Sequence, residues 1–115
     1  IVNIDIDLEL HLCINNSELN KWIQYKLDFL TTNGVDDGKL MDTLSSTVTF
    51  DACLVPTNLY EVFAIECSIP TSYFANGEKY LFGRLTRITA TGKDAPTNNP
   101  LLLRICKIYY EKVIM

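Results

Sequence analysis

Residues 4–14 alternate strictly between aliphatic residues at even positions and polar residues or cysteine at odd positions. A period of two residues is typical of a β-strand, whose successive side chains point to opposite faces of a sheet. A helix would spread the same aliphatic residues around its axis. The even positions are Ile4, Ile6, Leu8, Leu10, Leu12 and Ile14. This segment therefore predicts one long strand with a buried face and a polar face.

Five further segments are rich in β-branched and aromatic residues. They cover about residues 21–31, 45–56, 59–69, 80–90 and 101–113, and the third of them carries apolar residues on both faces, as a central strand would. Clusters of Gly, Pro, Asn and other turn-forming residues separate most of these segments, and residues 39–44 suit a single helical turn. Six such strands predict an all-β fold, an antiparallel β-sandwich or a flattened barrel.

The segment near residues 17–30 also permits a helix. Ser17 is a suitable N-cap, and an apolar stripe follows it at helical spacing. The alternation of Ile23, Tyr25 and Leu27 with polar residues favours a strand, which we expect to pair with the first strand as an antiparallel hairpin. The alternative fold is α+β, with this one helix packed across a sheet.

Length and composition indicate one domain over residues 1–115. The chain has 115 residues, is 48% hydrophobic and carries a net charge of −4. A chain of this size forms one domain, and its apolar runs are too short to span a bilayer. Nucleic acid is an unfavourable partner, because proteins that bind phosphates normally carry a basic excess. The sequence begins at Ile1, which suggests a processed product, a fragment or an incomplete record.

The sequence carries no motif for catalysis or for a cofactor. A lone histidine, His11, and the lack of a Gly-x-Ser-x-Gly motif give no nucleophile with its base. No glycine-rich phosphate loop is present, and the four cysteines form no Cys-x-x-Cys pair. We therefore expect a protein that is not an enzyme and binds no cofactor, with cysteines that are free and buried.

Charged and aromatic residues on the expected outward faces mark a candidate interaction surface. The first strand aligns an acidic row, and the last two strands carry basic residues that would form one patch if those strands paired. The only tryptophan is expected at the surface, where it would suit a sugar platform or a protein interface. The candidate residues are Asp5, Asp7, Glu9, His11, Trp22, Arg84, Arg87, Arg104 and Lys107.

We interpret the chain as a structural or assembly domain whose partners are copies of itself or other protein subunits. A subunit of a viral or phage particle, or of another oligomeric assembly, is the first hypothesis. The second is a ligand-binding β-sandwich module of the carbohydrate-binding type. The third is a small metal-binding protein or enzyme that uses the acidic face of the first strand, although neighbours on one face lie about 7 Å apart, too far for all of them to bind one ion.

Overall fold

The alternating segment at the start of the chain forms β1 (Val2–Cys13), the central strand of a three-stranded sheet in the order β5-β1-β7. The computed structural model describes residues 2–15, 18, 20–35 and 43–113, with side chains placed for these residues except in 2–5 and 106–113. β5 (Phe63–Ile69) and β7 (Leu101–Val113) flank β1, both antiparallel to it. The expected helical turn at 39–44 falls largely outside the described residues.

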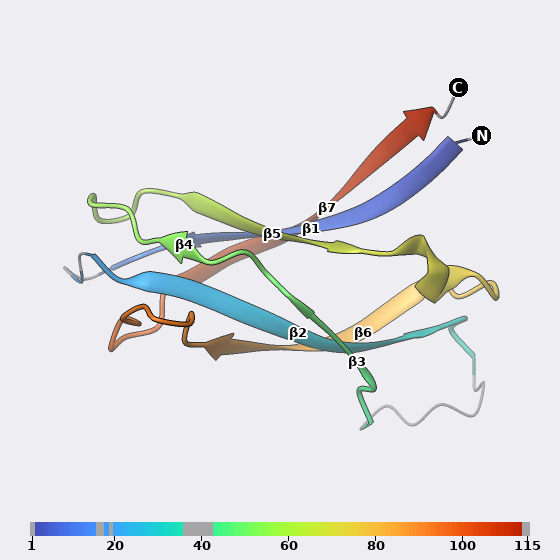
Figure 1. Cartoon of the computed structure of the whole chain (residues 1–115), viewed down its shortest axis with the longest axis horizontal. Coiled ribbons are helices and arrows are strands. Elements are labelled where there is room, and N and C mark those ends of the chain that lie inside the picture. Colours follow the sequence, from blue (N-terminus) through green and yellow to red (C-terminus); the bar gives the residue numbers. More distant parts are fainter. Residues whose placement is uncertain (1, 16–17, 19, 36–42, 114–115) are drawn as a thin grey trace.

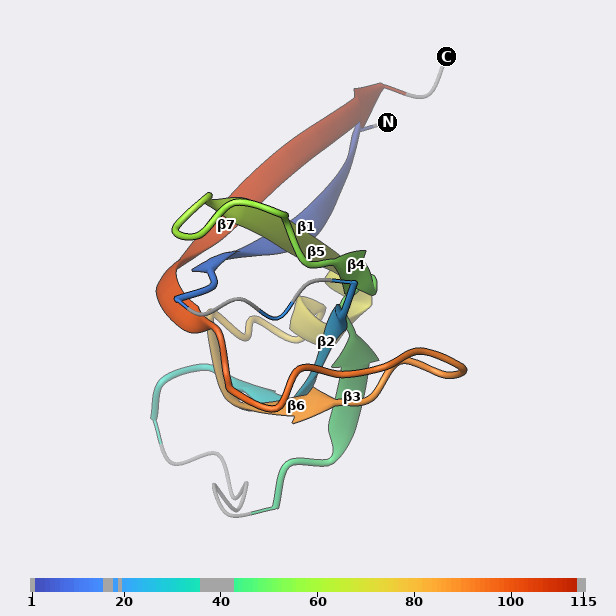
Figure 2. The same cartoon turned by 90° about the vertical axis from the view of Figure 1, so that its left-hand side faces the viewer.

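A second antiparallel sheet is built around β2 (Trp22–Thr32). β6 (Tyr80–Ile88) pairs with one edge of β2, while β3 (Ser46–Thr49) and β4 (Cys53–Leu54) pair with successive segments of β2. Figures 1 and 2 show the two sheets as the layers of a sandwich. The predicted all-β antiparallel sandwich is confirmed, and the alternative with a helix near residues 17–30 is wrong.

The core lies between the sheets and is formed by one face of each strand. The even residues of β1, the odd residues of β2 and the odd residues of β5 supply most of it, as their alternation requires. The fully buried large side chains are Leu10, Leu12, Ile23, Phe29, Phe50 and Ile69.

Three details of the expected strands were wrong. β1 and β2 do not form a hairpin, because they belong to different sheets. The expected strand 45–56 is two short strands, because the chain between them crosses from one sheet toward the other. Phe50 N–H still donates to Tyr25 O of β2, whereas the next residue, Asp51, donates its N–H to Glu66 O of β5. This crossing segment closes one edge of the sandwich.

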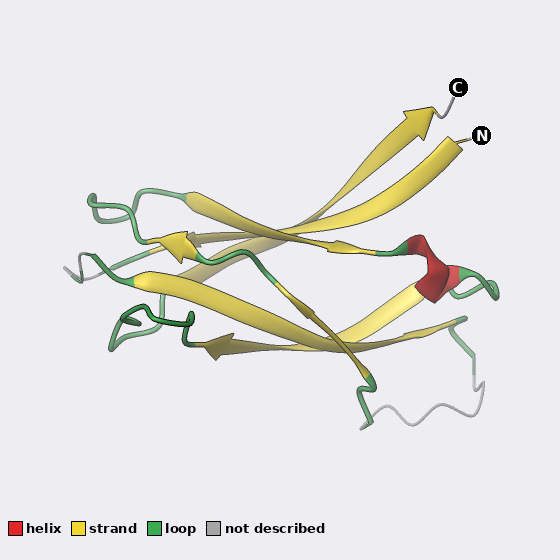
Figure 3. Ribbon diagram, viewed as in Figure 1, coloured by secondary structure: helices red, strands yellow, loops and turns green. Residues whose placement is uncertain are grey.

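The expected strand 59–69 begins only at Phe63 and is an edge strand of its sheet. Its odd residues are buried from Ile65 onward and partly buried at Phe63, and its even residues are exposed, so only one of its faces is covered. Of the apolar residues that suggested a second covered face, Tyr60 and Val62 belong to an exposed turn before β5, and Ala64 lies on its exposed face. After β5, residues Thr71–Phe74 form the short 3-10 helix η1 in a segment where no strand was predicted (Figure 3).

Candidate functional site

An apolar cleft of about 770 Å³ lies between the two sheets. Its walls come from β1, β2, β5, β6 and β7, with Phe50 and η1 contributing as well, while Glu78, Lys79 and Tyr80 are the polar residues among its lining. The aliphatic and aromatic side chains along it are Ile6, Leu8, Leu10, Leu27, Phe50, Ile69, Phe74, Leu81, Leu85 and Ile105.

The cleft exists because one edge of the sandwich is closed and the other is open. The segment around Phe50 and Asp51 bridges the sheets on the β5 side. On the opposite side, within the residues that the structure describes, β6 pairs with β2 alone and β7 pairs with β1 alone. Ile105 on β7 and Leu85 on β6 therefore line the same cavity without a strand between them.

The cleft is open to solvent at its mouth. Tyr80 and Ile105, which line it, are 55% and 54% exposed, whereas Leu10 and Phe50 at its inner wall are 1% exposed. Water therefore contacts the mouth of the cleft when the chain is alone. Displacing that water from apolar walls is favourable, so the cleft favours the binding of an apolar partner or ligand.

Half-exposed aliphatic side chains follow one another along the first part of β7, beside the cleft. We call Leu101, Leu102, Leu103 and Ile105 the β7 row, and these side chains are 43–54% exposed. Together they expose on the order of 300 Å². This area is divided between the two faces of the strand, because Leu102 and Ile105 pair with the core residues Leu12 and Leu10, whereas Leu101 pairs with Cys13. Ile105 is the member of the row that lines the cleft. The row lies on a strand of 13 residues whose second edge has no partner strand in the described part of the chain, and a long apolar edge of this kind favours association.

β1 and β7 also continue beyond the sandwich as a two-stranded ribbon. β5 pairs with β1 only from Ile6 to Leu12, whereas the β1–β7 ladder extends out to the pair Val2 and Val113. Figure 2 shows this ribbon rising away from the two layers and carrying both ends of the chain. An isolated two-stranded ribbon is only marginally stable in water, so contact with a neighbouring molecule would stabilise it.

The acidic row of β1 lies on the outer face of its sheet, away from the cleft. Arg104 Nε donates to His11 Nδ1 at 3.0 Å, and the His11 Nε2 atom lies 3.5 Å from a Glu9 carboxylate oxygen. The Nδ1 atom of His11 is thus the acceptor of the hydrogen bond from Arg104. Ser68 donates a hydrogen bond to Asp7. The structure thus brings four of the predicted residues, Asp7, Glu9, His11 and Arg104, to one polar surface.

Among the side chains that the structure describes, the acidic and histidine residues of this row do not form a metal centre. Across the residues that the structure describes, no three His, Cys, Asp or Glu side chains lie close enough together to hold a metal ion. The side chains of Asp5 and Lys107, which belong to the same prediction, lie outside the described side chains.

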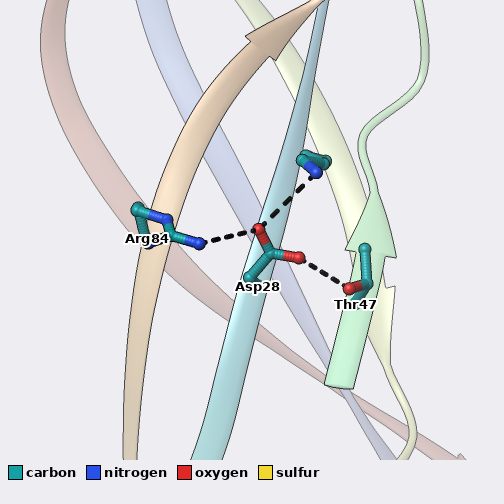
Figure 4. A network of polar contacts seen from close by, with 4 residues as sticks. Asp28, Thr47 and Arg84 are labelled. Carbon is teal, nitrogen blue, oxygen red and sulfur yellow. Dashed lines mark hydrogen bonds and ion pairs between the residues drawn. The ribbon is translucent and has the colours of Figure 1, made fainter. Parts of the chain in front are cut away.

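The described basic side chains of the last two strands do not form one patch, because β6 and β7 belong to different sheets. Arg84 lies on the outer face of the second sheet, 3.7 Å from the Asp28 carboxylate (Figure 4). Thr47 donates to the same carboxylate at 2.6 Å, and Lys26 lies 3.8 Å away. The Thr47 hydrogen bond, with smaller contributions from the two cations, holds the pKa of Asp28 below its ordinary value.

Trp22 and Arg87 hold the loop at residues 91–100 against the end of β2. Lys93 Nζ lies 4.6 Å from the centre of the half-buried Trp22 ring, and Arg87 donates to the carbonyl oxygens of Pro96 and Asn98 at 2.9 and 3.3 Å. Lys93 thus lies over the ring on which a sugar would stack.

Glu18 completes this attachment of the loop. Its carboxylate accepts the backbone N–H groups of Thr97 and Asn98 at 2.6 and 2.9 Å, and these two bonds lower its pKa.

Three cysteines can be described, and all three are free thiols. Cys13 and Cys67 are buried, and Cys53 is partly exposed. Burial raises the pKa of Cys67 to about 12, and the nearby carboxylates of Asp7 and Asp51 add to the rise. A thiol with so high a pKa is a poor nucleophile at neutral pH, which fits a core residue.

Comparisons with models of protein families, with curated proteins and with solved structures found no significant match to this chain. In the described part of the chain, no helix is long and apolar enough to cross a membrane.

The sequence interpretation missed the cleft and the β7 row. The residues of the row were assigned to a strand, but alternation cannot reveal that the strand lies at an open edge. A usable signal was the run of consecutive aliphatic residues Leu101–Leu103, since an ordinary edge strand with one covered face would have a polar residue among them.

Proposed function

We propose that this protein is a non-enzymatic structural subunit that associates with copies of itself through the apolar cleft and the β7 row. The observation that carries the proposal is the open edge of the sandwich, where the apolar cavity and a half-exposed aliphatic row lie side by side. A subunit of a viral or phage particle, or of another repeating assembly, is the kind of protein that would use such a domain.

A protein partner explains this surface better than a small ligand does. A ligand would fill the cleft but leave most of the β7 row in water. A protein partner would cover both, and a standard interface buries about 800 Å² on each side. A partner that wraps the free edge of β7 would cover at most about 300 Å² of the row, and the cleft walls and the rim at Tyr80 add to that area.

A second copy is the partner that the chain itself can supply. A second set of exposed apolar side chains, Leu59, Tyr60 and Val62, lies outside the cleft and the β7 row. A chain that carries both an apolar cleft and a separate exposed apolar segment has complementary surfaces for self-association.

A ligand-binding module is the second candidate function, because the volume of the cleft falls in the range of about 300–1,000 Å³ that is typical of small-molecule sites. Its walls would suit an aliphatic chain better than a sugar. Binding of a long-chain fatty acid by a chain that remains monomeric would favour this candidate over assembly.

The test is the molar mass of the full chain in solution, measured by light scattering over a range of concentrations. We expect oligomers for the wild type and monomers for Ile105→Lys, which places a charge at the rim of the cleft. Leu54→Lys is the matched control, because Leu54 on β4 is also about half exposed but does not line the cleft, and it should associate as the wild type does. A wild type that remains monomeric at high concentration would refute the proposal.

A further inference from the structure

The turn between β4 and β5 presents three large apolar side chains to solvent. We call residues 59–62 the apolar turn. Its side chains are 45% exposed at Leu59, 64% at Tyr60 and 58% at Val62. Tyr60 and Val62 are among the most exposed large apolar side chains in the described part of the molecule, so the turn offers a compact apolar projection.

Backbone and side-chain hydrogen bonds hold the turn in one conformation. Tyr60 N–H donates to Ile14 O at 2.9 Å, which ties the turn to the end of β1. Glu61 N–H donates to Asn58 O at 3.4 Å, and the Asn58 side chain donates to the Glu61 carboxylate at 3.2 Å. A projection fixed in this way loses little conformational entropy when it binds.

Tyr60 adopts a backbone conformation that is unfavourable for its residue type. Its φ angle is +61°, in the left-handed region that Gly and Asn adopt far more readily than an aromatic residue. The ring is mostly exposed, so its burial within the chain does not offset this strain. Strained, exposed residues of this kind concentrate at sites of binding, where a partner makes use of the side chain.

The apolar turn and the end of the cleft at η1 lie at opposite ends of β5. The turn comes directly before Phe63, where β5 begins, whereas Ile69 at its far end and Phe74 of η1 line the cleft. Seven residues of strand span about 23 Å. Figure 1 shows the turn at one end of the sandwich and η1 at the other. The side chains of the turn are exposed and line no part of the cleft of their own molecule, so they are available to the cleft of a neighbour.

We propose that the apolar turn of one copy inserts into the cleft of a second copy, so that the subunits associate head to tail. This inference rests on the proposed function and defines the contact by which self-association occurs. Turn and cleft are different surfaces, so the contact is heterologous. Such a contact continues from copy to copy and produces a closed ring or an open filament, depending on the rotation between neighbours.

Two variants of the full chain test the contact. Tyr60→Asn removes the ring and suits the positive φ, so it should fold at least as well as the wild type. Ile105→Lys blocks the rim of the cleft and leaves the turn intact. We expect each variant alone to be monomeric under conditions where the wild type assembles, with association weakened about tenfold or more. Tyr60→Phe, which keeps the ring, should assemble as the wild type does.

The decisive measurement is the mass of a mixture of the two variants. The intact turn of Ile105→Lys can enter the intact cleft of Tyr60→Asn, so the mixture should form a one-to-one heterodimer that grows no further. Normal assembly by Tyr60→Asn would overturn the head-to-tail contact while leaving self-association in place, and so would a mixture that remains monomeric. A wild type that remains monomeric would instead remove the proposed function itself.

Discussion

Two leucines on the buried face of β1 offer a matched test of the cleft. Leu10 and Leu12 are 1% and 0% exposed, lie two residues apart and face the same core. They differ in that Leu10 lines the cleft and Leu12 does not. Truncation to Ala removes the same atoms at both positions, so a difference in cost reports the surroundings alone.

The expected costs follow from the two contributions to such truncations. Loss of three buried carbon atoms costs about 2–3 kcal/mol at either position. Leu12→Ala also leaves a new closed cavity, which adds about 1–2 kcal/mol. Leu10→Ala instead leaves a void that opens into the cleft, where water can enter, so this second contribution is small. We expect the free energy of unfolding to fall by about 4 kcal/mol for Leu12→Ala and by about 2.5 kcal/mol for Leu10→Ala.

Urea denaturation of the two variants, at concentrations where the chain is monomeric, measures the difference. Equal costs would refute the reasoning, because they would mean that the void left at Leu10 does not open into the cleft.

Three further predictions concern residues outside the cleft. Asp28 has a lowered pKa in the folded state, so its contribution to stability is present above its unfolded pKa and is lost as the pH falls below about 4. Thr47→Val removes the largest cause of this shift and should flatten the dependence of stability on pH in that range, as urea titrations at several pH values would reveal. Gly34→Ala should lower stability by about 1–2 kcal/mol, because the φ angle is +93° and a Cβ atom would lie 2.5 Å from the Tyr80 ring; an unchanged melting temperature would contradict this. Cys67, buried and with a pKa of about 12, should react with a thiol reagent only after unfolding, so rapid labelling in native buffer would disprove its placement.

The sequence was sufficient to predict the strands that have one buried face. The alternation along β1 correctly predicted that Leu10 and Leu12 are buried, and Ile23 and Leu27 lie on the buried face of β2 as expected. These predictions succeed because a side-chain period of two is a local property of a strand. The same local information cannot specify which strands become neighbours, which is why the expected hairpin of β1 and β2 and the single basic patch were wrong.

The apolar turn and the open edge of the sandwich could not be predicted from the sequence for a related reason. The sequence does not distinguish apolar residues exposed in a turn from apolar residues buried in a strand, so residues 59–62 were predicted to belong to the same strand as residues 63–69. The asymmetry between the closed and open edges of the sandwich arises from the path of Phe50 and Asp51 across both sheets. That path depends on tertiary packing, which local patterns do not encode.

Hydrogen–deuterium exchange of the wild-type chain, followed from low to high micromolar concentration, tests the central claim most directly. Free edge amides of a strand exchange rapidly, and coverage by a neighbour slows them. We predict that the amides of β7 and of the apolar turn become protected as the concentration rises, while those of β3 and β4 do not change. Exchange that is the same at every concentration, or protection that appears away from β7 and the apolar turn, would contradict the account.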